Sequence, residues 1–285
     1  MSNKPTDNLL FGPQEPLGLL YHYTSAATFT DYIAPNMNLL LSAFDRMNDP
    51  RECDRWEFDW LNPSGDDFLQ GRERLNDDIR KHARLACFCR DEDTPTGKPA
   101  FHDIAYTRGF SRPRMWAQYA GNHAGVCLIF DRHKLLANFE AYMASHKLTL
   151  LFGVVDYANR KPVGGVWRED AFTVVDHEYR TVGADRYPLY HIAKHHRELF
   201  FRKQLDWRDE NEYRIVLFGP SEGDVLAPIS AALRHVVLGS KCTGELRQKV
   251  IAACCAQNVD ASSMTWKNGY PQPMPLVVGG RQRFL

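Results

Sequence analysis

The chain lacks the short motifs that identify many nucleotide-dependent and zinc-dependent enzymes. It has no GxxxxGK[ST] phosphate loop, no GxGxxG after a predicted strand and no HExxH pair. Its seven cysteines include no CxxC spacing, and several lie inside apolar runs, so we expect buried, reduced thiols and no zinc site. Lys+Arg and Asp+Glu balance at 35 each. This balance argues against a strong general affinity for nucleic acid but leaves a local basic groove open.

Long apolar runs are also missing. No run approaches the roughly 20 apolar residues that a membrane-spanning helix needs. Residues 1–18 are polar and Pro-rich, without the apolar segment of a signal peptide. We therefore expect a soluble, cytoplasmic protein that contacts no membrane.

Hydrophobic patterning predicts one domain. Hydrophobic residues make up 44% of the chain, enough for a substantial core, and predicted strands and helices mix without a regular βαβ order. This favours a single α+β domain over residues 18–285, preceded by a flexible arm at 1–17. A mobile loop is expected at 90–112 and an irregular insertion at 158–186. The predicted strands cover 18–24, 38–42, 85–89, 125–130, 150–157, 211–218, 235–239 and 263–267, and the predicted helices cover 25–34, 66–83, 115–119, 132–146, 187–204 and 243–257.

The segment 207–218 begins as a charged loop and ends as an apolar, β-branched strand. Strand alternation places Glu210, Glu212 and Arg214 on one face. It places Tyr213, Ile215 and Leu217 on the other. Charged groups that enter a buried sheet must pair or serve a function, because their desolvation is costly. Two interpretations stay open: a structural ion pair of Glu212 with Arg214 or another arginine, and a carboxylate that lines a cleft.

Two polar groups nearer the N-terminus are candidates for the wall of such a cleft. His22 and Thr24 share one face at the end of the first strand, opposite the neighbouring tyrosines. They are either satisfied structural residues or groups suited to recognise a ribose or an amide. The segment 48–52, Asn-Asp-Pro-Arg-Glu, has turn chemistry throughout. It is either a rigid turn or, through Arg51 and Glu52, part of a pocket wall.

The densest cluster of aromatic and polar residues is the block 115–125. Trp116 and Tyr119 are three residues apart and share one face of a predicted helical turn. Core packing alone accounts for Trp116, whereas Tyr119 and His123 carry polar atoms that need partners. Two glycines in the block would let the backbone approach a ligand closely.

A pair of histidines has the spacing of metal ligands. His191 and His195 are four residues apart on the predicted helix 187–204. No HExxH glutamate accompanies them, so a helix face that is solvated or compensates the helix dipole is favoured over a metal site. We expect no metal cofactor.

Several of these segments together resemble a family of bacterial proteins catalogued as domain of unknown function 2971. They occur in the expected order and span roughly residues 18–240. The family name implies no activity. The matching pieces are residues 20–24, 48–52, 115–120 with His123 and Gly125, and 203–214 with Trp207.

A second resemblance implies an activity. A strand-end His-x-Thr, a mid-chain aromatic residue and a late strand-entry glutamate are similar to the His-Tyr-Glu arrangement of ADP-ribosyltransferases, which have a mixed, split β-sheet flanked by helices. By this resemblance His22 would hold the nicotinamide ribose, Tyr119 would stack on nicotinamide and Glu212 would be the catalytic carboxylate. His22 and Glu212 should then face one cleft, within about 10 Å of each other. The stacking role is also open to Tyr23 or Trp116.

The same resemblance implies further contacts with NAD. An arginine would pair with the pyrophosphate in bidentate fashion, and Arg51, Arg112 and Arg114 are the candidates. The predicted NAD-contacting residues are Tyr23, Thr24, Asn48, Arg51, Trp116, His123 and Arg214.

Three functions remain open at this stage. The first is an NAD-dependent ADP-ribosyltransferase or NAD glycohydrolase-like enzyme, of the kind found among toxins and phage-defence effectors, with nucleic acid or protein as the acceptor. A fixed carboxylate can stabilise the oxocarbenium-like ribosyl centre of such a reaction. The second is a module that binds a nucleotide or nucleic acid without chemistry. The third is a nuclease that uses Glu52, Glu210 and Glu212 with a divalent metal.

Overall fold

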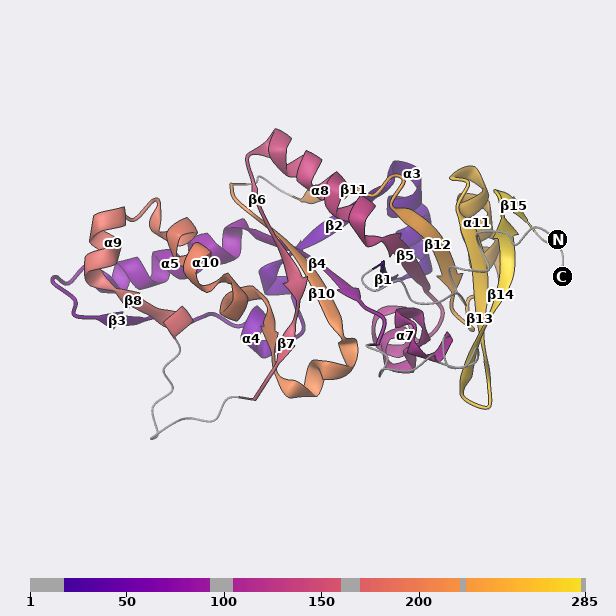
Figure 1. The fold of residues 1–285 in the computed structure, drawn as a ribbon, viewed down its shortest axis with the longest axis horizontal. Helices are drawn as coiled ribbons and strands as arrows, with labels where there is room; N and C mark the ends of the chain where they lie inside the picture. Colours follow the sequence, from indigo (N-terminus) through magenta and orange to yellow (C-terminus); the bar gives the residue numbers. More distant parts are fainter. Residues whose placement is uncertain (1–17, 93–104, 160–169, 221–223, 283–285) are drawn as a thin grey trace.

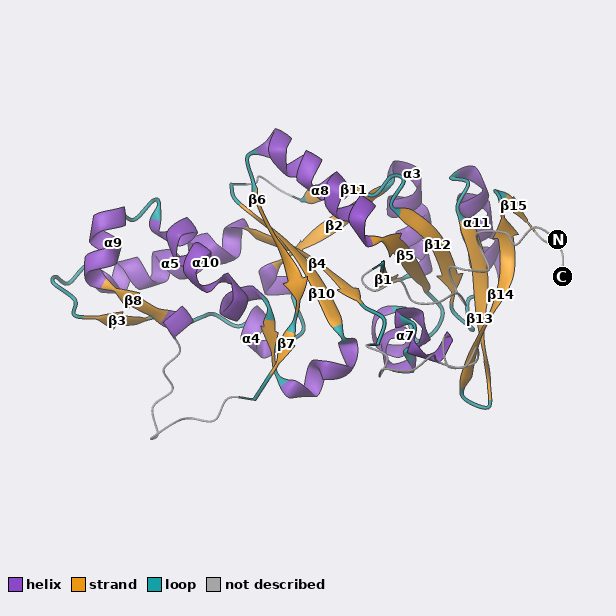
Figure 2. Cartoon of the chain, in the orientation of Figure 1, coloured by secondary structure: helices purple, strands orange, loops and turns teal. Residues whose placement is uncertain are grey.

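The computed structural model describes residues 18–92, 105–159, 170–220 and 224–282. The predicted arm at 1–17 lies outside the described residues, and so do parts of the predicted loop and insertion. The described chain has an α+β architecture built on one 11-stranded sheet flanked by helices (Figures 1 and 2). The sheet is mixed: β12 (Leu233–Leu238) pairs with β13 (Asp260–Lys267) in parallel, and its other described pairings are antiparallel.

The remaining elements have the following bounds. The other strands of the large sheet are β1 (Leu19–Thr24), β2 (Asn38–Ala43), β4 (Ala83–Cys89), β5 (Val126–Asp131), β6 (Thr149–Val154), β10 (Glu212–Phe218), β11 (Val225–Pro228), β14 (Tyr270–Val278) and β15 (Arg281–Gln282). Two short parallel pairs stand apart, β3 (Asp59–Leu61) with β8 (Thr173–Val175) and β7 (Asp156–Tyr157) with β9 (Arg202–Lys203). The main helices are α5 (Phe68–His82), α7 (Pro113–Tyr119), α8 (Arg132–His146), α9 (Asp176–Val182), α10 (Tyr187–Phe200) and α11 (Gly244–Ala256). Shorter helical segments are α2 (Ala26–Thr28), η1 (Phe29–Ile33), α3 (Ala34–Asn36), η2 (Phe44–Arg46), α4 (Pro50–Cys53), η3 (Gly109–Ser111), η4 (Asp170–Phe172) and η5 (Leu205–Glu210).

The large sheet splits at β4. One edge of β4 pairs with β10 along the whole length of both strands. The other edge pairs with β2 near its start and with β1 only at Cys89. Among the described strands none pairs with residues 86–88 on that edge, and His22 Nδ1 lies there, 3.0 Å from the carbonyl oxygen of Cys87. The sheet therefore has a gap between β1 and β2.

Strand register decides which side chains share a face. Cys89 lies opposite both Tyr21 and Glu212, and directly opposed residues project from the same face. Tyr21, Glu212 and Arg214 therefore share one face, and the alternate residues of β10 pack into the largest core cluster on the other. His22, the neighbour of Tyr21, projects from that second face.

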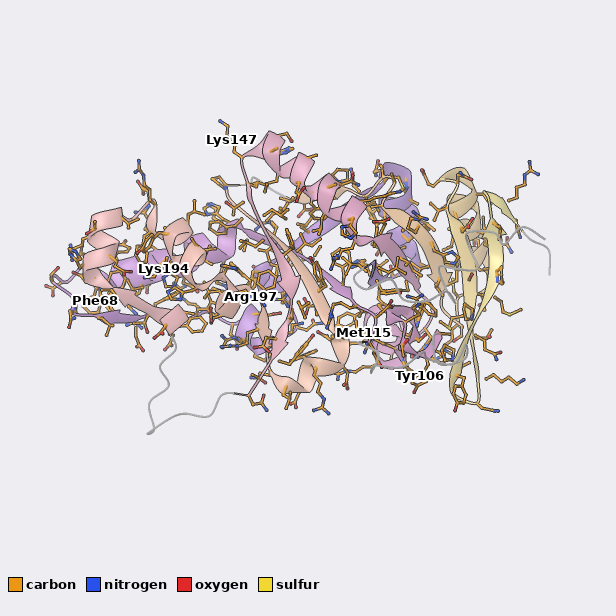
Figure 3. All side chains as sticks on the ribbon, in the orientation of Figure 1. Phe68, Tyr106, Met115, Lys147, Lys194 and Arg197 are labelled. Atoms are coloured by element: carbon orange, nitrogen blue, oxygen red, sulfur yellow. The ribbon has the colours of Figure 1, made fainter. Side chains whose placement is uncertain are left out.

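Helices complete the core on both sides of the sheet. α8 and α11 lie over the largest cluster, and α7 packs against β1 over a smaller one that contains Trp116. At one end of the molecule α5, α9 and α10 form a lobe with β3 and β8 (Figure 1). Phe68 and Lys194 lie in this lobe, far from Met115 on α7 (Figure 3). The candidate site lies at the gap in the sheet, and none of the residues that line it belongs to this lobe.

The structure confirms most of the predicted elements within two or three residues. The N-terminal helix begins after Ser25, whose side chain accepts a hydrogen bond from the N–H of Thr28. Two predictions were wrong. Residues 170–186, predicted as irregular, contain η4, β8 and α9, and the helix predicted to end at 204 ends at Phe200, where β9 follows. In the part of the chain that the structure describes, no helix is long and apolar enough to cross a bilayer.

Candidate functional site

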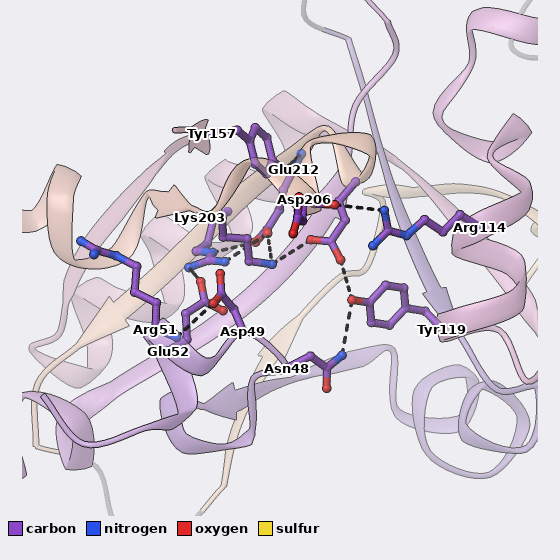
Figure 4. A network of polar contacts seen from close by, with 12 residues as sticks. Asn48, Asp49, Arg51, Glu52, Arg114, Tyr119, Tyr157, Lys203, Asp206 and Glu212 are labelled. Atoms are coloured by element: carbon purple, nitrogen blue, oxygen red, sulfur yellow. Dashed lines mark hydrogen bonds and ion pairs between the residues drawn. The ribbon is translucent and has the colours of Figure 1, made fainter. Parts of the chain in front are cut away.

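A cavity of about 280 Å³ lies at the gap in the sheet. Its volume is near the lower end of small-molecule sites, enough for one ring-and-sugar unit and too small to enclose a whole dinucleotide. The walls combine aromatic rings with carboxylates, and Figure 4 shows the polar part of this arrangement. The lining residues that matter below are Tyr21, His22, Tyr23, Arg46, Asn48, Glu52, Phe88, Tyr119, Lys203, Glu210 and Glu212.

Glu212 and Arg214, two residues apart on β10, form a two-point ion pair. Arg214 Nε donates to Glu212 Oε1 at 2.6 Å, and Arg214 Nη2 donates to Oε2 at 3.0 Å. The side chains are 3% and 0% exposed. Burial alone would raise the pKa of Glu212, but the charges of Arg214 and Lys203 outweigh it and hold that pKa well below its usual range. The carboxylate is thus both part of an ion pair and part of the cavity wall.

Lys203, on β9, bridges two carboxylates. Its Nζ lies 2.8 Å from Glu210 Oε2 and 2.8 Å from Glu212 Oε2. Burial opposes the charge of Lys203, but Glu212 and the nearby carboxylates raise its pKa above the usual value. No charge pattern in the sequence singles out Lys203, because its partners come from other elements.

Glu210 joins this cluster from a 3-10 helix, whereas strand alternation had placed it on β10. It ends η5, and Asn211, with φ of 44°, separates it from β10, so its placement on the strand face was wrong. The Tyr119 hydroxyl donates to Glu210 Oε1 at 2.5 Å, and Asn48 Nδ2 donates to that hydroxyl oxygen at 3.4 Å. Burial and the charge of Glu210 raise the pKa of Tyr119. The phenol therefore stays protonated at neutral pH.

Glu52 supplies a third buried carboxylate. It lies on α4, whose N-cap Asp49 accepts a hydrogen bond from the N–H of Arg51, so the turn 48–52 is rigid and also builds the cavity wall. Glu52 is 1% exposed, and its Oε1 lies 2.6 Å from Arg214 Nη1. Burial raises the pKa of Glu52 although Arg214 and Lys203 act in the opposite direction. Three carboxylates thus surround two cations.

His22 and Tyr23 border the cavity from β1. The Tyr23 hydroxyl donates to the carbonyl oxygen of Gly109 at 2.7 Å, and its ring meets Trp116 edge-on. Burial lowers the pKa of His22, so this imidazole is mostly neutral at pH 7. His22 and Glu212 both line the cavity, but their strands present them from opposite faces of the sheet. The prediction that they face one cleft from the same side was therefore wrong, and this placement counts against the ADP-ribosyltransferase resemblance. The gap lets both reach the same space.

Other predicted contact residues lie outside this lining. Trp116 is fully buried, with its Nε1 donating to the carbonyl oxygen of Phe110 at 2.7 Å. Arg51 Nη2 donates to the carbonyl oxygen of Glu198 at 3.1 Å, so it points to the lobe. Arg214 lies behind Glu212 and Glu52. Thr24 and His123, the other two predicted NAD contacts, also lie outside the cavity lining. The His123 ring packs near Trp266.

The arrangement of donors bears on metal binding. Among the described residues no three His, Cys, Asp or Glu side chains are grouped to hold a metal. Lys203 Nζ occupies the position between Glu210 and Glu212 that a bridging divalent cation would need. His191 is buried, and its Nε2 lies 2.8 Å from the carbonyl oxygen of Ala171. Its predicted place on a solvated face was therefore wrong. The arrangement gives no support to a metal-dependent nuclease.

Comparison with known proteins adds one finding. No curated protein and no solved structure matches the chain. The stretch from α7 to β10 contains four polar residues of the cavity wall, Tyr119, Lys203, Glu210 and Glu212. Residues 115–215, within this stretch, match the model of a family described as a protein of unknown function, DUF2971, which supports the resemblance to that family.

Proposed function

We propose that the protein cleaves NAD at the nicotinamide N-glycosidic bond, as an ADP-ribosyltransferase or an NAD glycohydrolase does. The observation that carries this proposal is the meeting of His22, Tyr119 and Glu212 at one cavity in a split, mixed sheet. These residues come from β1, α7 and β10, and each is the residue that the His-Tyr-Glu resemblance assigns to the site.

The chemistry of the cavity suits this reaction. The bond between ribose C1′ and the nicotinamide nitrogen breaks, and its electron pair leaves with nicotinamide, which becomes neutral. The cationic C1′ is then captured by water or by an acceptor nucleophile, which loses a proton. A carboxylate that stabilises this cation must be ionised, and Arg214 and Lys203 keep Glu212 ionised. Burial fixes its position, so no reorganisation is needed as positive charge develops.

The size of the cavity limits what it encloses. The nicotinamide and its ribose fit within about 280 Å³, so the pyrophosphate and adenosine would lie outside. Arg46 lines the cavity and is exposed, which makes it a better pyrophosphate partner than Arg51. Arg114 is 43% exposed beside η5 and remains a second candidate (Figure 4).

Incubation of the purified protein with nicotinamide-labelled NAD tests the proposal. We expect release of free nicotinamide, with Tyr119→Ala and Glu212→Gln much slower than the wild type. Glu245→Gln is the matched control, because Glu245 is exposed on α11 and pairs only with Lys249 among the described residues. Release that is the same in all four proteins would reject the assignment of the site.

A second candidate function has one observation in its favour. Glu212 is already held by Arg214 and Lys203, which is also what a non-catalytic binding module would show. Such a module would bind NAD or another nucleotide at the cavity and release no nicotinamide. Equilibrium binding measured beside turnover separates the two functions.

A further inference from the structure

The outer edges of the large sheet differ in how they are protected from pairing with another strand. A free strand edge attracts other strands, and proteins shield such edges with prolines, charged residues or very short strands. β11 has four residues and ends at Pro228, β15 has two, and the part of β14 that does not pair with β15 carries three prolines. β6 has none of these features. It is six residues long, and the segment 148–155 contains no proline and no charged residue.

The backbone of β6 presents hydrogen-bonding groups on this unprotected side. One edge of β6 pairs with β10, and no described strand pairs with the other edge. The N–H of Val155 donates to the carbonyl oxygen of Glu212 on β10 at 3.0 Å. Successive residues of a strand point their N–H and C=O groups to alternate sides. The N–H and C=O groups of residues 150, 152 and 154 therefore point outward, away from β10.

This outer edge is open over most of its length. In the part of the chain that the structure describes, its one hydrogen bond is the contact of Arg197 Nη2 with the carbonyl oxygen of Val154, at 3.5 Å. The side chains of Phe152 and Val154 are 45% and 38% exposed, and Leu150 is half-buried. The same three residues thus offer outward backbone groups and apolar side chains on one face. Such an edge is suited to accept a further β-strand.

We propose that this edge of β6 pairs with β6 of a second copy of the chain, antiparallel and about a two-fold axis at Phe152. That axis places Phe152 opposite the partner's Phe152, and Leu150 opposite the partner's Val154. Each of the three opposed pairs can then exchange two backbone hydrogen bonds, and apolar side chains face apolar side chains. The strand has no charge by which a different partner would be selected, whereas its pattern complements itself.

The interface is independent of the cavity, because no residue of β6 lines it. An interface of one strand per copy is small, so we expect weak association. Sedimentation equilibrium of the purified protein over about 1–200 µM should show monomer and dimer in exchange. The apparent mass should rise with concentration toward that of two chains.

Opposite charges at the axis test the pairing and its register. Phe152→Lys and Phe152→Glu each place like charges directly opposite in a homodimer, so the dissociation constant of each variant should rise at least about tenfold. An equal mixture of the two variants should dimerise again, because the introduced lysine of one copy then faces the introduced glutamate of the other. Leu69→Lys is the matched control. Leu69 is 57% exposed on α5, in the lobe, so this variant should dimerise like the wild type.

Hydrogen–deuterium exchange on the wild type covers the case in which a variant does not fold. The N–H groups of Leu150 and Phe152 should exchange more slowly at high protein concentration, since pairing protects them. The N–H of Leu151, which points toward β10, should exchange at the same rate at both concentrations. Three results would overturn the inference: a protein that stays monomeric over the whole concentration range, a dimer that Phe152→Lys leaves intact, and a mixture of the two charged variants that stays monomeric.

Discussion

Replacing Glu212 by glutamine tests the central ion pair most directly. The change keeps the shape of a side chain that is 3% exposed and removes the charge that faces Arg214 at 2.6 Å and Lys203 at 2.8 Å. Breaking a buried pair on one side typically costs about 3–5 kcal/mol, because the remaining charge stays buried. For a chain of this size, that loss corresponds to a fall in melting temperature of roughly 5–8 °C.

Urea denaturation, followed by circular dichroism at several pH values, measures the loss in the free energy of unfolding. The pKa of Glu212 is lower in the folded protein than its usual value of 4.5, so its ionised form stabilises the fold above about pH 4.5. That contribution disappears as the pH falls toward the folded pKa. The difference between wild type and Glu212→Gln should therefore be largest near pH 7 and shrink below pH 4.5. A matched control, Glu245→Gln, changes an exposed pair and should leave the denaturation midpoint unchanged.

The activity of the same variant separates two roles. At a temperature where Glu212→Gln remains folded, we expect NAD turnover to fall by about 100-fold or more, as is typical for the loss of one key electrostatic group. A stable variant, within about 1 kcal/mol of the wild type at pH 7, would refute the importance of the ion pair for folding. A destabilised variant with full turnover would leave Glu212 with a structural role only.

Three further predictions concern the neighbours of Glu212. Tyr119→Ala should weaken NAD binding, measured by calorimetry, by about 1 kcal/mol beyond the effect of the lost contact area. Trp116→Ala should mainly lower the melting temperature, because the indole is fully buried. The reverse result would exchange the roles of the two residues. Lys203→Met should destabilise the fold at pH 7, because Glu210 and Glu212 lose the cation that lies 2.8 Å from both. A denaturation midpoint equal to that of the wild type would contradict this. NAD cleavage should persist in EDTA, and an EDTA-sensitive nuclease activity that depends on Glu210 would instead favour the metal-dependent alternative.

Local pattern was enough to predict β1, β4, α7 and β10, but not β9, which carries Lys203, or η5, which carries Glu210. The alternation of β10 correctly separated Glu212 and Arg214 from Tyr213, Ile215 and Leu217, which pack into the largest core cluster, because successive side chains of a strand point to opposite faces. The pattern failed at Glu210, where Asn211 adopts a left-handed conformation and interrupts the strand. It also missed β14, in which prolines occupy alternate positions 271, 273 and 275. Because the prolines occupy every second position, the residues between them keep their N–H groups and can bond to β13. A strand is therefore possible despite the three prolines.

The sequence by itself determined the α+β class, the bounds of most helices and strands, and the requirement that Glu212 and Arg214 be paired or used. These properties depend on residues that are near one another in the chain. Only the tertiary structure decided that β4 pairs with β1 and β2 at separate points, which opens the gap that holds the cavity. It also decided that Lys203 and Glu52 meet the charges of β10. The physical reason is that a buried charge needs a partner but does not specify where in the sequence that partner lies.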